Sequence, residues 1–266
     1  MNSKLISIVL QFALIGTLSA TTPADSARKP DINAYITKLD SPAAPEREAA
    51  ARQLGNMGTA AKPAQEKLVA ALNDKDDSVR VMAAYALKRL GYEPAKVLPV
   101  FMDCLKAQTP AVRNTAAMEL GGYADQLSAQ QKKRAITALL PVVGKDTDVT
   151  TRANAILSLA HLGAHEKYML DALLKGLKDE AEPVRAASAY TISVTCAKAK
   201  KTVPALEALL SDKSVEVRET AAVSLGRLGK KAKSALKALN ALASDSEARV
   251  REAAKAAADK ITNAKS

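Results

Sequence analysis

Arginine recurs along this chain at a nearly constant interval, and that interval constrains the fold more than any other feature of the sequence. The series contains seven arginines, which are Arg47, Arg80, Arg113, Arg152, Arg185, Arg218 and Arg251. Neighbouring members are 33 residues apart, except that 39 residues separate the third from the fourth. A fixed period in this range predicts a solenoid, in which each repeat is one supersecondary unit that buries its apolar face only by stacking on its neighbours.

Each arginine begins the same helical pattern. In the repeat of Arg218, a small residue follows after three positions and apolar residues follow after seven and ten, namely Ala221, Leu225 and Leu228. These positions share one face of a helix. A glycine stands 11 residues after the arginine in four repeats, as Gly58, Gly91, Gly163 and Gly229. Glycine there favours a left-handed C-cap, so the first helix of each repeat is predicted to end at this point.

A second apolar stripe follows at offsets 18, 21, 22 and 25 from the arginine, as in Leu98, Phe101, Met102 and Leu105. It predicts a second helix in each repeat. The six extra residues between Arg113 and Arg152 fall around GGYADQLSAQ, where they predict a longer turn; subtracting them places Leu140 at offset 21. Counting backwards, the array is expected to open on a second helix near residues 32–39 and to close on a first helix at 247–262.

The fold class is therefore an all-α, right-handed α-solenoid of about seven helix pairs, with fourteen helices in total. Composition agrees, because the chain has no Trp and only two Phe and so lacks the aromatic mass of a compact mixed core. The predicted organisation is a signal peptide at residues 1–26 and a solenoid at residues 27–266.

The repeat resembles a known family. The pattern D-x-x-x-x-V-R-x-x-A-A-x-x-L-x-x-L-G, which runs here from Asp212 to Gly229, resembles the HEAT repeat, and in particular the short repeats of phycobilisome-lyase-like proteins. The resemblance covers roughly residues 31–262. The chain departs from the pattern at four positions. Glu46 and Thr151 replace the valine that precedes the arginine in the pattern, and Ala124 and Cys196 replace its glycine.

Aspartate stands six residues before the arginine in five repeats, as Asp74, Asp146, Asp179, Asp212 and Asp245. An aspartate there can cap helix-terminal amides, and the arginine fork can bond it across the turn. The family resemblance implies that such residues form a ladder that holds neighbouring repeats in register. The predicted Arg–Asp ladder consists of these five aspartates and Arg80, Arg113, Arg152, Arg185, Arg218 and Arg251. A row of ligand-binding arginines is the alternative, but a periodic residue in a solenoid usually serves stacking.

The N-terminus has the features of a secretory signal. Lys4 precedes the apolar run LISIVLQFALIGTL, and small residues follow it. The run would rise only about 21 Å as a helix, which is short for a membrane span. We therefore expect an exported protein, periplasmic or secreted, without an integral span after cleavage; an uncleaved anchor is the alternative, and the cleavage point stays open.

The chain is basic, with 39 Lys and Arg against 28 Asp and Glu and a formal net charge of +11. A surplus of this sign favours anionic partners. In several repeats the predicted turn between the two helices is rich in cations, and stacking would align these turns as one basic edge. The basic edge is the candidate partner-binding site and consists of Lys132, Lys133, Arg134, Lys167, Lys198, Lys200, Lys201, Lys230, Lys231 and Lys233. A solvated, merely solubilising edge is the alternative.

Signals for catalysis are poor, and neither a metal nor a cofactor is predicted. His161 and His165 are the only histidines, and Gly163 between them argues against a shared helical face. Cys104 and Cys196 lie in repeats three apart, too far to bridge, and are expected to be buried thiols. No Gly-rich phosphate loop or nucleophile elbow occurs.

The predicted function is an exported, non-enzymatic scaffold that binds another macromolecule, through the basic edge if that partner is an acidic protein or an anionic envelope component. The resemblance leaves a lyase-like, chromophore-handling factor as one alternative. A HEAT-like DNA-binding protein is another, if the chain is not exported; export makes nucleic acid an improbable partner. A spacer in the cell envelope is the third.

Overall fold

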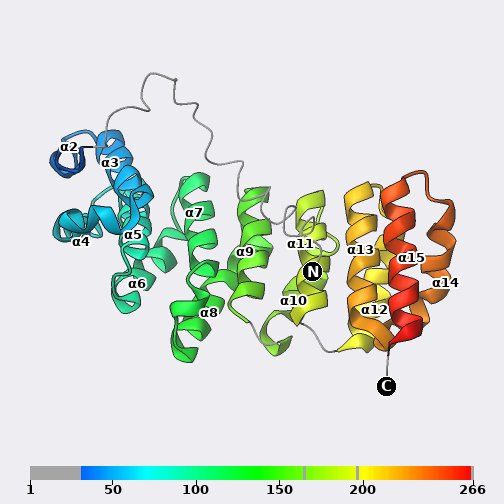
Figure 1. Ribbon diagram of the computed structural model, residues 1–266. Coiled ribbons are helices and arrows are strands. Elements are labelled where there is room, and N and C mark those ends of the chain that lie inside the picture. The colour runs from blue at the N-terminus through cyan, green and yellow to red at the C-terminus, as the bar shows by residue number, and fades with distance from the viewer. Residues whose placement is uncertain (1–30, 164–165, 196–197, 265–266) are drawn as a thin grey trace.

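The structure is a computed structural model that describes residues 31–163, 166–195 and 198–264. These residues form a single row of stacked helices (Figure 1). The first helices of the repeats are α3 (Ala44–Asn56), α5 (Asp77–Arg89), α7 (Pro110–Gly121), α9 (Val149–His161), α11 (Glu182–Thr195), α13 (Val215–Leu228) and α15 (Ala248–Asn263). Each packs on the next, so that they form one layer of the solenoid.

The second helices form the other layer. They are α2 (Ile32–Lys38), α4 (Gln65–Ala71), α6 (Pro94–Cys104), α8 (Ala129–Lys145), α10 (Glu166–Gly176), α12 (Ala199–Ala208) and α14 (Leu236–Ala241). Short 3₁₀ helices extend several of them or precede them, namely η2 (Gly58–Ala64), η3 (Ala124–Gln126), η4 (Leu209–Ser211), η5 (Gly229–Ala235) and η6 (Leu242–Ser244). The predicted α-solenoid is confirmed, and within the described residues it opens on a second helix, closes on a first helix and has seven helices of each kind.

The apolar stripes form one continuous core. The small residue three positions after each arginine is at most 1% exposed in every repeat, from Ala50 to Ala254. The leucine or isoleucine at offset seven is fully buried in the first six repeats, from Leu54 to Leu225. Because these side chains are small on one turn and large on the next, successive first helices approach closely. Gly121 and Gly226 mark the tightest approaches to a neighbouring backbone, since a Cβ there would lie 2.8 Å from the Cα of Ser158 and of Ala257, respectively.

The predicted helix ends are also confirmed. Gly58, Gly91, Gly163 and Gly229 have φ between 54° and 74°, a backbone region that glycine enters without the steric cost of a side chain. Ala124 lacks that freedom, and the chain there continues instead as the 3₁₀ turn η3.

The extra residues of the third repeat do not form a simple longer turn, as the sequence had suggested. Most of them form η3 and an added N-terminal turn of α8, which begins at the capping box of Ser128 and Gln131. Leu139 is fully buried at the place that Phe101 and Leu173 hold in their repeats, whereas Leu140 is only half-buried. The expected position of Leu140 was therefore wrong by one residue, because one of the six extra residues lies beyond this point, in the longer C-terminal part of α8.

One junction differs from the others. At offset eight, where Gly55 and Gly121 permit close contact, α5 carries Lys88. Its ammonium binds Glu119 at 2.7 Å and lies 5.4 Å from the centre of the Tyr123 ring. These larger side chains fill the space between α5 and α7, which pack less closely than the other pairs of first helices.

Candidate binding edge and groove

The Arg–Asp ladder joins successive repeats, with a different pairing from the one expected. Arg185 donates from Nε and Nη2 to the carboxylate of Asp212, at 2.7 and 2.8 Å, and both side chains are less than a tenth exposed. Its third nitrogen, Nη1, donates to the backbone carbonyl of Asp179 at 2.9 Å. The fork therefore holds the aspartate of the following repeat, while the preceding aspartate offers only its carbonyl oxygen.

The same bidentate pairing recurs at Arg47–Asp74, Arg113–Asp146, Arg152–Asp179 and Arg218–Asp245. In each aspartate, Oδ1 also accepts the backbone N–H two residues later, at the start of the next helix. Each of these aspartates thus fixes the end of one repeat to the start of the next, so the arginines serve architecture.

Two predicted ladder members lack a ladder partner among the described residues. Arg80 has Ala107 where the aspartate should stand; it binds Asp77 instead and lies 3.8 Å from Asp103. Arg251 belongs to the last repeat, so its Nη1 binds only the backbone oxygens of Asp245 and Ser246. Arg47, in contrast, is a full member.

Guanidinium and amide donors keep the ladder carboxylates ionised. Burial alone would raise the pKa of Asp146, Asp179 and Asp212, but hydrogen bonds from the arginine and the following backbone N–H outweigh it and lower the pKa. For Asp74 and Asp245 the arginine hydrogen bond is the largest influence and lowers the pKa directly. The ladder is therefore a row of charge-neutral pairs.

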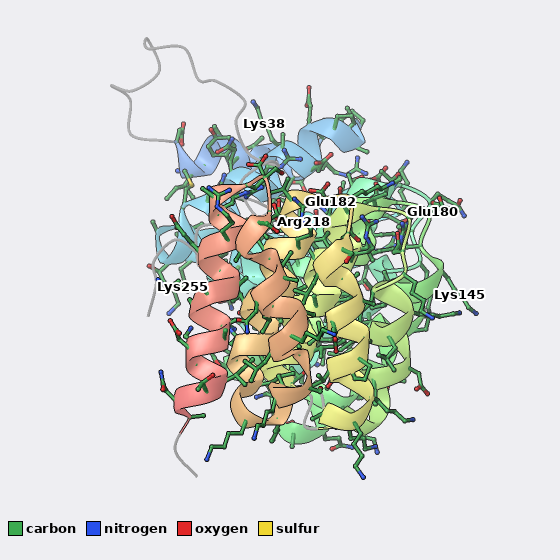
Figure 2. The ribbon with its side chains drawn as sticks, turned by 90° about the vertical axis from the view of Figure 1, so that its right-hand side faces the viewer. Lys38, Lys145, Glu180, Glu182, Arg218 and Lys255 are labelled. Atoms are coloured by element: carbon green, nitrogen blue, oxygen red, sulfur yellow. The ribbon has the colours of Figure 1, made fainter. Side chains whose placement is uncertain are left out.

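The basic edge lies at the other end of the helices. In Figure 1 the first helices run from the upper edge to the lower edge, as α15 does, whose C-terminal end is marked below. The second helices run back from the lower edge to the upper edge. The Arg–Asp ladder lies at the upper edge, where Figure 2 labels its member Arg218. A helix of 13 residues spans about 20 Å, so the two edges are separated by more than a Debye length at physiological salt.

The structure places the cations of the basic edge on helical turns. Lys198 is the N-cap of α12, and Lys200 and Lys201 lie in its first turn. Lys230, Lys231 and Lys233 lie in η5. All six are exposed. Lys167 lies in α10, but its side chain is outside the described part of the chain.

Lys132, Lys133 and Arg134 were expected in a turn, and that expectation was wrong. They lie in α8, because the capping box starts this helix at Ala129, ahead of all three. Sequence reasoning also missed Lys62 and Lys96, both exposed, which stand at the same place in the first two repeats. Their offsets of 15 and 16 from Arg47 and Arg80 carried the signal. Cations therefore lie at the start of the second helix, or in the 3₁₀ helix just before it, in every repeat from Arg47 to Arg218.

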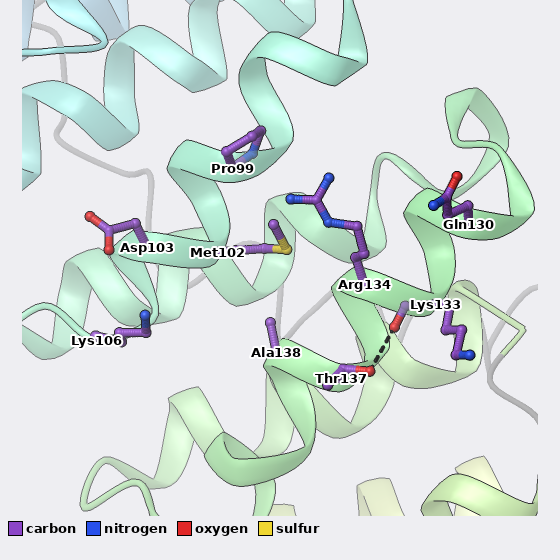
Figure 3. Close-up of a pocket in the computed structure, with 9 residues that line it drawn as sticks. All are labelled: Pro99, Met102, Asp103, Lys106, Gln130, Lys133, Arg134, Thr137 and Ala138. Carbon is purple, nitrogen blue, oxygen red and sulfur yellow. Dashed lines mark hydrogen bonds between the residues drawn. The ribbon is translucent and has the colours of Figure 1, made fainter.

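A groove of about 660 Å³ lies between α6 and α8, on the face of the second helices. Its floor is apolar and is formed by Pro99, Met102 and Ala138. Charged side chains surround it, with Asp103 on α6, Lys106 in the turn after α6, and Lys133 and Arg134 on α8 (Figure 3). Gln130 and Thr137 complete the lining, and the Thr137 hydroxyl donates to the Lys133 carbonyl oxygen at 2.9 Å. This groove was not predicted, because the sequence placed Arg134 in a turn.

The remaining candidates from the sequence offer little chemistry. His161 ends α9 and is exposed, while His165 lies outside the described residues. No three His, Cys, Asp or Glu residues within the described ranges are placed to hold a metal ion. Cys104 is a buried free thiol, and burial raises its pKa to about 12; Cys196 lies outside the described ranges. No helix in the described part of the chain has the length and apolarity to cross a membrane.

Comparison with solved structures supports the fold. An engineered protein matches with a TM-score of 0.63 and 22% identity, over 88% of this chain and 68% of its own. The complex of CpcE and CpcF of phycocyanin lyase from Nostoc sp. PCC7120 matches with a TM-score of 0.51 and 23% identity, over 90% of this chain and 98% of its own. At this level of identity the likeness concerns the fold alone.

Family assignment comes from the repeats themselves. A sequence profile described as HEAT repeats matches residues 32–121, 98–193 and 170–259, which overlap to span nearly the whole solenoid. The repeat period, the helix pairs and the Arg–Asp ladder agree with this match. The chain belongs to the family of HEAT-repeat proteins.

Proposed function

We propose that this chain is an exported scaffold that binds an acidic protein through its basic edge and performs no catalytic step of its own. One observation carries the proposal: the cations of the basic edge are not neutralised in the way that the ladder is. Lys198, Lys200, Lys201, Lys231 and Lys233 are exposed and form no ion pair within the described residues. Lysines that stack along one edge raise the positive electrostatic potential there, and this potential attracts an anionic partner over long range.

The shape of the solenoid supports a macromolecular partner. The lysines lie at the start of successive second helices. Figure 1 shows these helices following one another along the solenoid, so the lysines form a row. A row of this kind fits an extended acidic surface better than one small anion. HEAT solenoids offer such long surfaces through their modular stacking.

Export is part of the proposal and rests on residues 1–26, which lie outside the described residues. The mass of the mature protein tests it. Expression in a cell with a general secretion pathway should yield a soluble envelope or culture fraction that has lost about 20 to 26 N-terminal residues. An intact N-terminus on a chain retained in the cytoplasm would contradict export.

Affinity capture tests the binding edge. The bait is the full chain, compared with a variant in which Lys198, Lys200, Lys201, Lys230, Lys231 and Lys233 are changed to Glu. A matched control reverses six exposed lysines away from this edge, which are Lys38, Lys75, Lys145, Lys175, Lys178 and Lys213. Each variant must keep the native helical content and cooperative melting, so that loss of capture reports on binding.

The proposal predicts that an acidic protein from an envelope extract is retained by the native chain and the control and is lost by the edge variant. Retention should also fall as salt rises, since exposed charges are screened. Equal capture by all three baits would overturn the basic edge as the binding site and favour a spacer role.

A further inference from the structure

The groove between α6 and α8 lies at the one junction between described repeats where the ladder is interrupted. Ala107 replaces the aspartate there, so Arg80 has no bidentate partner in the described residues and lies 3.8 Å from Asp103, on the rim of the groove. On the other face of the same junction, Lys88 and Glu119 fill the space between α5 and α7. The groove is thus a local departure from the repeat.

Its charges define the kind of ligand that fits. Lys106, Lys133 and Arg134 contribute three positive charges, against the single carboxylate of Asp103. Asp103 is partly balanced by Arg80, and none of the three cations forms an ion pair within the described residues. Figure 3 shows Lys106 at the C-terminal end of α6, in the turn that follows it, and the other two cations on α8, so positive charge flanks the floor from both sides.

The floor is apolar but small. Met102 and Ala138 are half-buried and Pro99 is exposed, and together they offer a surface for about one apolar side chain. Methionine adapts its shape to a ligand, because its side chain is unbranched and polarisable. A long acyl chain would extend past this floor onto charged side chains, where it would bury no apolar surface.

We propose that the groove binds an acidic segment of a protein partner, with one apolar side chain seated on Met102, Pro99 and Ala138. Carboxylates before and after that side chain pair with Lys106 on one side and with Lys133 and Arg134 on the other. This inference rests on the proposed function and deepens it, because the basic edge supplies long-range attraction while the groove fixes which segment of the partner binds. Lys133 and Arg134 belong to both surfaces and connect them.

Two fluorescently labelled peptides test the groove with the full chain. One carries a single leucine with three glutamates on each side, and the other has serine in place of leucine. Seating the leucine on the floor predicts about tenfold tighter binding of the leucine peptide at constant salt. Met102→Gln keeps the length of the side chain and removes its apolar surface, so the preference should fall to nearly one.

Two charge reversals complete the design. Arg134→Glu should weaken both peptides severalfold, whereas Lys237→Glu, a matched reversal on the distant helix α14, should leave the leucine preference unchanged. Melting curves establish that each variant is folded. Equal binding of both peptides to the native chain, no measurable binding of either, or a preference that survives Met102→Gln would overturn the proposal.

The outcome is separable from that of the proposed function. The six-lysine edge variant leaves Met102, Lys106 and Arg134 in place, so it should retain the leucine preference even if it no longer captures the protein partner. A chain that captures an acidic protein through its edge but shows no leucine preference would refute the groove alone.

Discussion

Removal of one ladder aspartate should destabilise the solenoid far more than removal of an exposed one. In Asp212→Ala, Arg185 loses two charge-assisted hydrogen bonds of 2.7 and 2.8 Å, at a site where the two side chains are 7% and 9% exposed. Breaking a buried pair costs about 3 to 5 kcal/mol, because it leaves the other charge uncompensated. Since Nη1 of Arg185 keeps its carbonyl partners, we expect the lower end, about 3 kcal/mol.

Asp40→Ala is the matched control. Asp40 pairs with Lys67 at 2.6 Å across the same interval of 27 residues, but the side chains are 59% and 47% exposed. Exposed pairs contribute less than about 1 kcal/mol. For a chain of this size, 3 kcal/mol lowers the melting temperature by about 6 to 12 °C, whereas the control should shift by no more than about 4 °C.

Urea denaturation followed by circular dichroism measures both variants. A double-mutant cycle with Arg185→Ala separates the pair from the loss of each side chain alone, and should give a coupling of about 2 kcal/mol. If Asp212→Ala cost no more than Asp40→Ala, the ladder would not hold the repeats together, and the structural role of the periodic arginines would be refuted.

Four further predictions follow from the same contacts. Ala107→Asp should supply the missing partner of Arg80 and raise the free energy of unfolding by about 1 kcal/mol in urea titrations; a loss of stability would contradict the pairing rule. Gly226→Ala should cost about 1 to 2 kcal/mol, because its Cβ meets the backbone of α15, whereas Gly144→Ala, in open space, should gain about 0.5 kcal/mol in the same assay. The ladder carboxylates have lowered pKa values in the folded chain, so the unfolded chain binds more protons in acid; stability should be fully present above about pH 5 and should fall as the pH drops below the ordinary aspartate pKa of about 3.9. Melting curves between pH 3 and 7 that stay level would contradict this. Because burial raises the pKa of Cys104 to about 12, its thiol should resist alkylation at pH 8 until denaturant unfolds the chain, in a variant with serine at the other cysteine; rapid labelling of the native chain would contradict it.

The fold was predictable because every repeat carries the same information. An arginine, a small residue and two apolar residues at fixed offsets determine one helix and its buried face, and the period of 33 determines the stacking. The glycines at offset 11 were equally informative, since their positive φ is a property of single residues. Local signals of this kind survive in the folded chain because each repeat has the same neighbours.

The third repeat shows where this reasoning ends. Six extra residues could lengthen either a turn or a helix. The capping box of Ser128 and Gln131 starts α8 at Ala129, so the helix is lengthened. Its apolar residues allowed two alignments one residue apart, and packing selected Leu139 rather than Leu140. The offset count alone could not distinguish the two, because both residues are leucine.

The site was predictable only in part. The row of lysines could be read from offsets, because each lysine lies near the start of a second helix. The ladder partner was harder to identify, since an arginine has one aspartate 6 residues before it and another 27 residues after it. Only the stacked structure shows that the fork reaches the second. The groove depends on how α6 and α8 face each other, which no single repeat encodes.

Amide hydrogen exchange with the captured partner would test the central claim most directly. Full chain alone and full chain with partner are compared, peptide by peptide. The account predicts slower exchange at residues 198–201 and in η5 (Gly229–Ala235), at the basic edge, with no change in the ladder turns at 179–182 and 212–214. Slower exchange confined to the ladder turns, or no protection at the basic edge, would contradict it.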